Sequence, residues 1–315
     1  MKKQILDHGY IELIESWGSD ERIIEAARMS TGKGFLGWGE PKDHNKCRKC
    51  GVMRVHAYPF DGGPQYHLPP NPPGNEAGRQ CAETGGHEWE VHPGDEKLLQ
   101  YLMENRHDTP FEFGGIVIEI QAPIMVFREW HRHRTASYNE MSARYEPLPD
   151  VNYVPTVERL LINSKTNKQA GVVKGAAVLD EDGAEWFRRQ LTAAYQDDQA
   201  LYEVALARGV PKELARAHLP VGRYSRMRAH TCLRNWLAFM TLRKDKNAQY
   251  EIRQYANALG DIVEQCFPRT WELFSLRHPG RWDDDGPDYY EFQIASLEKK
   301  LADIKKEYAS KKVSL

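Results

Sequence analysis

The sequence predicts a mixed α/β (α+β) protein, and three observations carry this prediction. Ile116, Ile118 and Ile120 alternate with Val117, Glu119 and Gln121, a pattern typical of a strand with one buried face. Much of the second half has apolar residues at helical spacing, most clearly over residues 186–204. Of the 315 residues, 41% are hydrophobic and 28% charged, which is the mix of a folded globular protein rather than a disordered one.

Composition and charge also argue against several classes of protein. A net charge of −2 disfavours a protein that wraps polymeric nucleic acid. The longest apolar run, residues 236–240, is far shorter than the roughly 20 residues of a membrane span, and the N-terminus is too polar for a secretory peptide. Five cysteines are too few for a disulfide framework. We therefore expect a cytoplasmic protein without membrane association.

The elements of the first half follow in order. A β-compatible run covers Tyr10–Ser16, and Ser19 and Asp20 provide N-cap oxygens for a helix over Glu21–Arg28. Core patterning resumes at Asp95 with apolar residues on one helical face over 98–103. Pro123 ends the Ile-rich strand, and residues 124–134 are expected to be helical.

In the second half, the long helix of residues 186–204 is expected to end at Gly209, and Pro211 can open the next helix. Residues 234–243 and 248–266 predict two more helices. Near the C-terminus, apolar residues repeat at spacings of three and four from Ile294 to Tyr308. This seam is too short for a coiled coil on its own, so we favour a helix docked on its own body or on a neighbouring subunit.

Residues 35–94 differ from their surroundings and read as an insertion. Nine of the eighteen residues over 58–75 are Pro or Gly, and no regular element is expected there. A Cys-x-x-Cys pair and a later Cys and His supply the four ligands that tetrahedral zinc prefers. We therefore predict a structural zinc site in a zinc-binding module, with His92 as a substitute fourth ligand and a redox pair as the less favoured alternative. The predicted ligands are Cys47, Cys50, Cys81 and His87.

The densest polar cluster covers residues 128–145. It contains four arginines and two histidines, together with hydroxyl, amide and carboxylate groups. Guanidinium groups bind phosphate through paired donors, so this cluster favours an anionic small molecule, most simply a nucleotide. The alternative is a solvated helix face held by ion pairs.

The run from Arg132 to Tyr145 resembles the signature of the flavin-dependent thymidylate synthases, which is Arg-His-Arg, seven residues and Ser. Further similar segments lie at 5–10, 26–30, 107–112, 210–220 and 242–252. The resemblance covers about residues 1–34 and 95–275. It divides the chain into a catalytic domain of 1–34 and 95–282, the insertion at 35–94, and a helical tail at 283–315.

This resemblance implies a fold with a central antiparallel or mixed sheet and long helices. It implies a homotetramer with shared active sites, in which FAD is reduced by NADPH. A one-carbon unit passes from methylenetetrahydrofolate to C5 of a pyrimidine deoxynucleotide monophosphate, so that dUMP becomes dTMP. The cofactor carries the redox chemistry, while the protein supplies binding and electrostatics.

The resemblance also assigns residues. Those expected to contact FAD are Ser30, His107, Thr109, Glu112, Arg132, His133, Arg134, Asn139, Arg234 and Asn247. Those expected to hold the nucleotide are Glu129, Arg132, Glu140, Ser142, Arg144, Arg216 and Arg243, with Arg144 and Arg216 on its phosphate. Arg243, Ser142 and Arg132 are expected at the reacting atoms, with Ser142 binding the nucleotide rather than acting as a nucleophile.

The sequence departs from the family pattern at several positions. Glu129 stands where the family commonly has Gln, while Cys232, Ala238 and Asn247 replace other polar residues. A carboxylate accepts a hydrogen bond from the amino group of cytosine, so one hypothesis is a dCMP C5 methyl- or hydroxymethyltransferase. We prefer the alternative in which Glu129 faces solvent or pairs with Arg128 or Arg132.

The remaining alternatives concern the class of protein. Cys232 is expected to be an inert buried thiol. A more distant alternative is a zinc-ribbon nucleic-acid-binding protein whose arginines grip phosphates. Another is a degenerate homologue that binds a nucleotide without turnover.

Overall fold

The computed structural model describes residues 1–38, 42–47, 55–57, 65–67, 89–92, 94–162 and 171–278. The chain divides into two compact units. The first contains Met1–Ile23 and the described residues from Asp108 onward, and the second contains Ile24–His107. Each unit is described by itself below.

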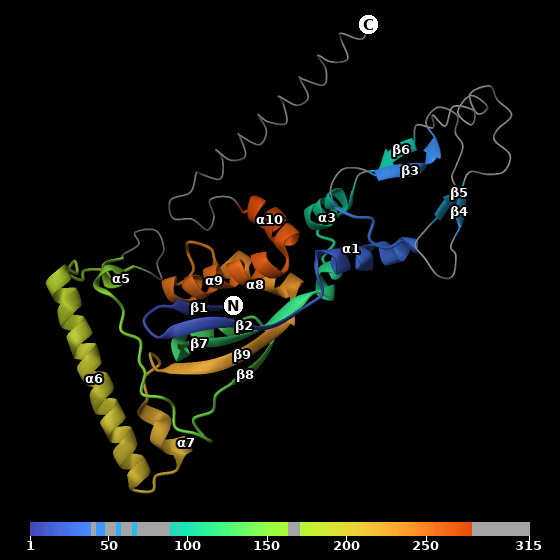
Figure 1. Ribbon diagram of the computed structural model, residues 1–315. Coiled ribbons are helices and arrows are strands. Elements are labelled where there is room, and N and C mark those ends of the chain that lie inside the picture. Colours follow the sequence, from blue (N-terminus) through green and yellow to red (C-terminus); the bar gives the residue numbers. More distant parts are fainter. Residues whose placement is uncertain are drawn as a thin grey trace, which may run out of the picture. The chain divides into compact units, whose positions relative to one another are not determined.

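The first unit is built on a five-stranded sheet with the strand order β1-β2-β7-β9-β8. Every neighbouring pair in this sheet is antiparallel, which agrees with the expected antiparallel or mixed sheet. The strands are β1 (Lys2–Ile5), β2 (Gly9–Trp17), β7 (Gly115–Pro123), β8 (Ser137–Glu140) and β9 (Tyr224–Cys232). Figure 1 shows β7 and β9 running side by side through the middle of the sheet.

One face of this sheet forms the core. Ile116, Ile118 and Ile120 of β7 are fully buried, and β9 places Met227 and Ala229 beside them on the same face. Three helices cover this side: α4 (Ile124–Trp130), α8 (Leu233–Arg243) and α9 (Tyr250–Cys266). Figure 1 shows α8 and α9 lying over the sheet. Because alternate residues point away from the core, the opposite face of β7 and β9 is polar.

Further helices flank this core. They are α5 (Val157–Leu161), α6 (Glu181–Ala207), α7 (Lys212–Ala215), α10 (Pro268–Leu276) and the 3-10 helices η2 (Thr109–Phe113) and η3 (Arg216–His218). The side chain of Arg223, just before β9, is fully buried. It donates hydrogen bonds to the carbonyl of Pro149 (2.8 Å), to Asp150 (2.8 Å) and to Gln199 of α6 (2.5 Å). This one side chain therefore connects the sheet, α6 and the segment that follows β8.

The second unit contains α1 (Asp20–Arg28), which begins in the first unit, together with η1 (Met29–Thr31) and α3 (Asp95–Glu104). The buried carboxylate of Asp95 accepts hydrogen bonds from Arg28 and from the backbone N–H groups of Leu36 and Gly37. Two short antiparallel pairs join β3 (Lys42–Cys47) to β6 (Trp89–His92) and β4 (Val55–Ala57) to β5 (Gln65–His67).

Most predicted elements are confirmed. The strand at 10–16 is within β2, the Ile-rich strand is β7, and the helices at 21–28, 98–103, 186–204, 234–243 and 248–266 correspond to α1, α3, α6, α8 and α9. The helix expected over 124–134 is shorter, because α4 ends at Trp130. The expectation that no regular element lies within 58–75 is wrong, since Gln65–His67 forms β5.

The N-cap prediction is half right. Ser19 accepts from the Arg22 N–H (3.4 Å), but the buried carboxylate of Asp20 serves a different helix. It accepts from the backbone N–H groups of Arg269 (2.9 Å) and Thr270 (3.2 Å) and thereby caps α10. The apolar seam at 294–308 lies outside the described residues. Within the part that the structure describes, no helix is both long and apolar enough to cross a bilayer.

We expect Arg223→Ala to lower the free energy of unfolding by about 3 kcal/mol. The substitution removes a buried charged side chain and leaves its three hydrogen-bond acceptors without their donor. Urea unfolding measures this change. Arg228→Ala is the matched control, since its ion pair with Glu119 leaves the arginine side chain 60% exposed and is expected to cost less than about 1 kcal/mol. Equal losses in the two variants would contradict the role assigned to Arg223.

Candidate functional site

The centre of the site is a contact between three predicted site residues from two helices and a turn. The guanidinium of Arg243, at the C-terminal end of α8, donates through Nε to the Nε2 atom of His133 (3.0 Å). Its Nη1 donates to the carboxylate of Glu129 (2.5 Å) and its Nη2 to the Glu129 carbonyl oxygen (2.9 Å). The Arg243 side chain is only 16% exposed and that of Glu129 is 37% exposed. We refer to these three residues as the Arg243 clamp.

This contact corrects the preferred expectation for Glu129. The carboxylate neither faces solvent alone nor pairs with Arg128 or Arg132, because its partner is Arg243. Arg128 and Arg132 are both exposed, so neither offers the partly buried position that Arg243 provides.

The turn after α4 holds His133 in place. The hydroxyl of Tyr138 donates to the carbonyl oxygens of both Trp130 (3.2 Å) and His133 (2.8 Å). Burial raises the pKa of Tyr138 to about 12, so the hydroxyl keeps its proton at neutral pH. The His133 ring also lies 4.7 Å from the ring of Phe239 on α8. The turn is therefore fixed against the helix that carries Arg243.

His133 is neutral at physiological pH. Burial, and then the positive charge of Arg243, lower its pKa from 6.5 to about 4, although the charge of Glu129 acts in the opposite direction. Because Nε2 accepts from Arg243, the ring proton of the neutral imidazole resides on Nδ1. The clamp thus combines one cation, one carboxylate and one neutral ring.

Other arginines near this turn remain available. Arg132, Arg134 and Arg216 are exposed, and their guanidinium groups form no hydrogen bond or ion pair with the rest of the described chain. Within the described part of the chain, the Arg144 side chain forms one ion pair, at the surface with Glu213 (3.2 Å). Glu213 is on α7, about one turn before Arg216. The ion pair therefore places Arg144 on a segment next to the one that carries Arg216, and these are the two arginines expected at a phosphate. Exposed, unpaired guanidinium groups are suited to an anion.

The remaining residues expected to hold the nucleotide lie on or just after β8. Glu140 is the last residue of β8 and is half-buried. The Ser142 hydroxyl accepts from the backbone N–H of Arg144 (3.3 Å), which orders the turn that carries this arginine. Asn139 is exposed on β8 and opposite Arg228 of β9.

A second pair joins residues expected at the flavin. Arg234, near the start of α8, donates to Glu112 of η2 (2.6 Å) and lies 3.9 Å from Asp108. Thr109 begins η2 and is exposed. The side chain of Asn247 donates to Asp245 (3.0 Å) in the connection between α8 and α9, so its amide is held locally.

Two predicted flavin residues belong to the second unit. The Ser30 hydroxyl donates to the Ala27 carbonyl (3.1 Å), and the His107 ring lies edge-on to Tyr101 at 5.5 Å. Both side chains are exposed.

The predicted zinc ligands Cys50, Cys81 and His87 lie outside the described residues, and Cys47 is placed only as the last residue of β3. The substitute ligand His92 is the last residue of β6. Among the residues that the structure does describe, no cluster of three or more His, Cys, Asp or Glu side chains could hold a metal ion. Cys232 is a free thiol before α8 and is half-buried rather than fully buried.

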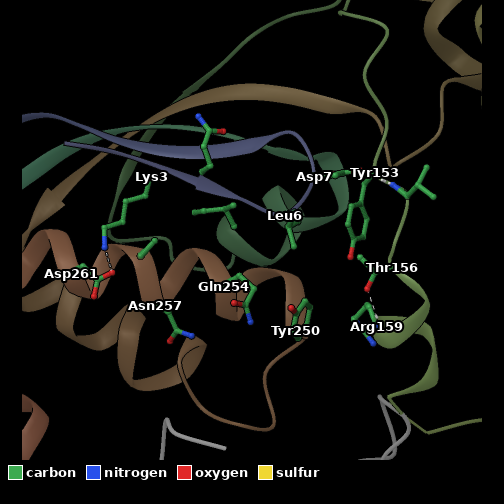
Figure 2. A pocket seen from close by; sticks show the side chains of 14 residues that line it. Lys3, Leu6, Asp7, Tyr153, Thr156, Arg159, Tyr250, Gln254, Asn257 and Asp261 are labelled. Atoms are coloured by element: carbon green, nitrogen blue, oxygen red, sulfur yellow. Dashed lines mark hydrogen bonds and ion pairs between the residues drawn. The ribbon is translucent and has the colours of Figure 1, made fainter.

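The sequence reasoning missed a cavity of about 560 Å³ in the first unit. Figure 2 shows its lining side chains from the β1–β2 connection, from the 153–159 segment and from α9. Three of its charged side chains have ionic partners, since Arg159 donates to Glu251 (2.7 Å) and Lys3 pairs with Asp261. None of the predicted site residues lines it. Its residues come from three distant segments, so no local motif could have found it.

The residues of the first unit fit a flavin dinucleotide beside a nucleotide. Both molecules carry phosphates, and the exposed guanidinium groups of Arg132, Arg134 and Arg216 provide free paired donors for them. The Arg243 clamp adds a partly buried position with both a donor and an acceptor. The site therefore has the groups that a protein needs to bind anionic nucleotides, carried on an antiparallel α/β scaffold.

The comparisons with known proteins identify the family. The profile of the thymidylate synthase complementing protein family, Thy1, matches residues 12–269. A flavin-dependent thymidylate synthase of Rickettsia prowazekii is 33% identical over 86% of this chain and 77% of its own length. One from Thermus thermophilus is 32% identical, again over 86% and 77%. The chain belongs to this family of flavin-dependent thymidylate synthases.

A solved structure agrees. The UMP/dUMP methylase PolB of Streptomyces cacaoi, bound with 5-Br dUMP, is similar with a TM-score of 0.60 and 26% identity. The similarity covers 87% of this chain and 97% of that chain.

The lowered pKa of His133 predicts a pH dependence of stability. The unfolded ring takes up its proton near pH 6.5 and the folded ring only near pH 4, so folding stability is lost as the pH falls through this window. The loss from this group is expected to be at most about 3 kcal/mol. Urea unfolding between pH 8 and pH 4 measures it, and His133→Gln, which keeps an acceptor but does not titrate, should have a flatter profile. Parallel profiles for the two proteins would show that His133 is not responsible.

Proposed function

We propose that the chain is an FAD-dependent methyltransferase that carries a one-carbon unit from methylenetetrahydrofolate to C5 of dUMP and yields dTMP, with NADPH as the reductant. Membership of the family and the complete Arg-His-Arg signature support this activity. The observation that carries it is the Arg243 clamp, which joins the signature turn to the end of α8.

The nucleotide phosphate is assigned to Arg144 and Arg216. Both are exposed. Among the described residues, Arg144 forms one ion pair, with a solvated carboxylate on α7, which an incoming phosphate can replace at small cost. Ser142 and Glu140 provide a hydroxyl and a carboxylate for the sugar and base. In this arrangement Ser142 binds the nucleotide and is not a nucleophile.

The pyrimidine ring is assigned to Arg243. A partly buried guanidinium donates strong hydrogen bonds to a carbonyl oxygen, and the electron withdrawal that results promotes attack at the ring carbon. The neutral His133 and the carboxylate of Glu129 hold this guanidinium in one orientation, so the ring encounters preorganised donors. Arg132, on the same turn, is assigned to the space between nucleotide and flavin.

The flavin is assigned to the signature turn and to the segment around η2. The residues of the first unit proposed to hold it are Thr109, Glu112, Arg132, His133, Arg134, Asn139, Arg234 and Asn247. When bound, FAD supplies the hydride and one-carbon chemistry that no amino-acid side chain provides. The protein's part is to bind its phosphates through free arginines and to exclude water from the ring.

We further propose that the chain works as a homotetramer with shared active sites. Exposed apolar side chains on α6 support an assembly, since Trp186, Leu201 and Val204 are 57%, 56% and 48% exposed. Exposed apolar side chains along one helix are typical of a helix that packs against another protein surface.

The activity is tested by incubating the purified protein with FAD, NADPH, methylenetetrahydrofolate and dUMP and identifying the product by mass spectrometry. We expect dTMP, and we expect flavin bands in the absorption spectrum.

Arg144→Ala should raise the KM for dUMP by 10-fold or more, because a charged hydrogen bond to phosphate is worth about 1.5–3 kcal/mol. Lys174→Ala, in an exposed loop, is the control and should not change KM. A colourless protein that forms no dTMP would disprove the proposed function.

We also propose that the insertion binds one structural zinc ion through Cys47, Cys50, Cys81 and His87. The Cys-x-x-Cys spacing supports it, and a segment rich in Pro and Gly gains most of its order from a metal. Metal analysis of the purified chain should find about one zinc per chain, and a Cys47→Ser/Cys50→Ser variant should lose it. Less than half an equivalent in the unmodified protein would count against the site.

A further inference from the structure

We propose that Thr231 and Asn235 are positioning residues for the flavin: they hold the backbone next to Arg134, so that this arginine is already in place when FAD binds. The inference rests on the proposed function, because it takes Arg134 as a group that contacts FAD. It depends on how the signature turn, residues 131–136, is attached to the rest of the first unit.

One carbonyl group of this turn is bound by two side chains. The Thr231 hydroxyl donates to the carbonyl oxygen of Thr135 (2.9 Å), and the side-chain amide of Asn235 donates to the same oxygen (3.2 Å). The amide also donates to the Thr231 hydroxyl (3.0 Å), so the two side chains support each other. The opposite orientation of the amide would bring two oxygen atoms together, so the network itself assigns the amide. We refer to Thr231 and Asn235 as the Thr135 anchor.

The hydroxyl of Thr231 lies on an otherwise apolar face. Thr231 is the penultimate residue of β9 and is only 5% exposed, on the inward face that also carries Met227 and Ala229. Valine has nearly the same shape without a polar group, so it would be buried here at less cost. A buried hydroxyl is tolerated when it is hydrogen-bonded. The bonds to Thr135 and Asn235 are therefore the physical reason why a hydroxyl is stable at this position.

Arg134 lies between two fixed peptide groups. On one side the Tyr138 hydroxyl holds the carbonyl of His133 (2.8 Å), and on the other side the anchor holds the carbonyl of Thr135. A trans peptide is planar, so a fixed carbonyl also fixes the N–H of the next residue, which points the opposite way. The N–H of Arg134 is fixed in this way, and it donates no hydrogen bond within the described chain.

This arrangement makes Arg134 a preorganised donor. Its backbone is held on both sides, while its side chain is exposed and has no partner in the described chain. The guanidinium can therefore bind an anionic group of FAD without first giving up another contact, and the turn that carries it loses little freedom on binding. Without the anchor, the cost of ordering the turn would be added to the cost of binding FAD.

The anchor also relates Arg134 to a second pair of groups proposed to hold the flavin. Asn235 directly follows Arg234 in α8, and Arg234 donates to Glu112 of η2 (2.6 Å). The first turn of α8 is thus bonded both to the signature turn and to η2. Two distant segments that are proposed to contact the same cofactor are held in one fixed relation by this turn.

The test measures the dissociation constant of FAD by titrating the flavin-free full-length protein and following flavin fluorescence. We expect Thr231→Val and Asn235→Ala each to raise this constant at least 5-fold, which corresponds to about 1 kcal/mol. Thr231→Ser keeps the hydroxyl and should bind FAD as tightly as the unmodified protein. Thr192→Val is the matched control, because it removes the same kind of bond, from a hydroxyl to the carbonyl of Arg188 (2.9 Å), on α6. It should leave the constant unchanged.

A double-mutant cycle shows whether the anchor acts through Arg134. Arg134→Ala removes the side chain that the anchor positions. Thr231→Val should therefore raise the constant less than 2-fold when it is added to Arg134→Ala. A merely structural role would weaken FAD binding by the same factor in both backgrounds.

The outcomes separate the inference from the function on which it rests. If the unmodified protein binds FAD and Thr231→Val binds it less than 2-fold more weakly, the inference is wrong and the proposed function stands. Equal factors with and without Arg134 also overturn it. If Thr231→Val does not fold, Asn235→Ala decides by the same comparison. If the unmodified protein does not bind FAD, the proposed function itself is wrong.

Discussion

The site depends on the neutralisation of one partly buried cation. Arg243 is 16% exposed, and a guanidinium in that position is costly unless its donors are satisfied. Glu129 provides charge and two acceptors, while His133 provides a third acceptor only as long as it is neutral. Burial and the charge of Arg243 keep the pKa of His133 low, so the arginine itself maintains the protonation state that it requires. The three groups therefore form one interdependent unit.

The sheet explains why these residues meet. β7 and β9 are antiparallel, so α4, which follows β7 directly, and α8, which follows β9 directly, start from opposite ends of the sheet. At about 1.5 Å per residue the two helices are roughly 10 and 16 Å long, against about 30 Å for a nine-residue strand. Helices that start at opposite ends and run toward each other over that distance bring their C-terminal ends together. Glu129 is in the last turn of α4, and Arg243 is the last residue of α8.

The same geometry separates what the sequence could predict from what it could not. Periodicity found β7 and α9 because their buried residues are large and regularly spaced. It also found α6, although only Ala184 and Tyr202 of that helix are buried within this chain. It missed β9, whose inward residues Ala229 and Thr231 are small or polar and whose outward face carries arginines. The signature indicated an anion site, but the partner of Glu129 is 114 residues away along the chain. Only the assembly of two strands and two helices creates that contact, so no local spacing predicts it.

The arginines of the first unit consequently fall into two groups. Arg159, Arg223, Arg234 and Arg243 each pair with a carboxylate that belongs to a different segment, and these contacts connect elements of the fold. Arg132, Arg134 and Arg216 have no such partner in the described chain and are exposed. A net charge of −2 for the whole chain thus conceals a local excess of unpaired positive charge beside the signature turn. Because the carboxylates are already committed to the structural arginines, a phosphate meets little competition for the others. Arg234 and Arg243 combine the two roles in the proposed function, since each pairs with a carboxylate of another segment and still has unused N–H donors for a ligand.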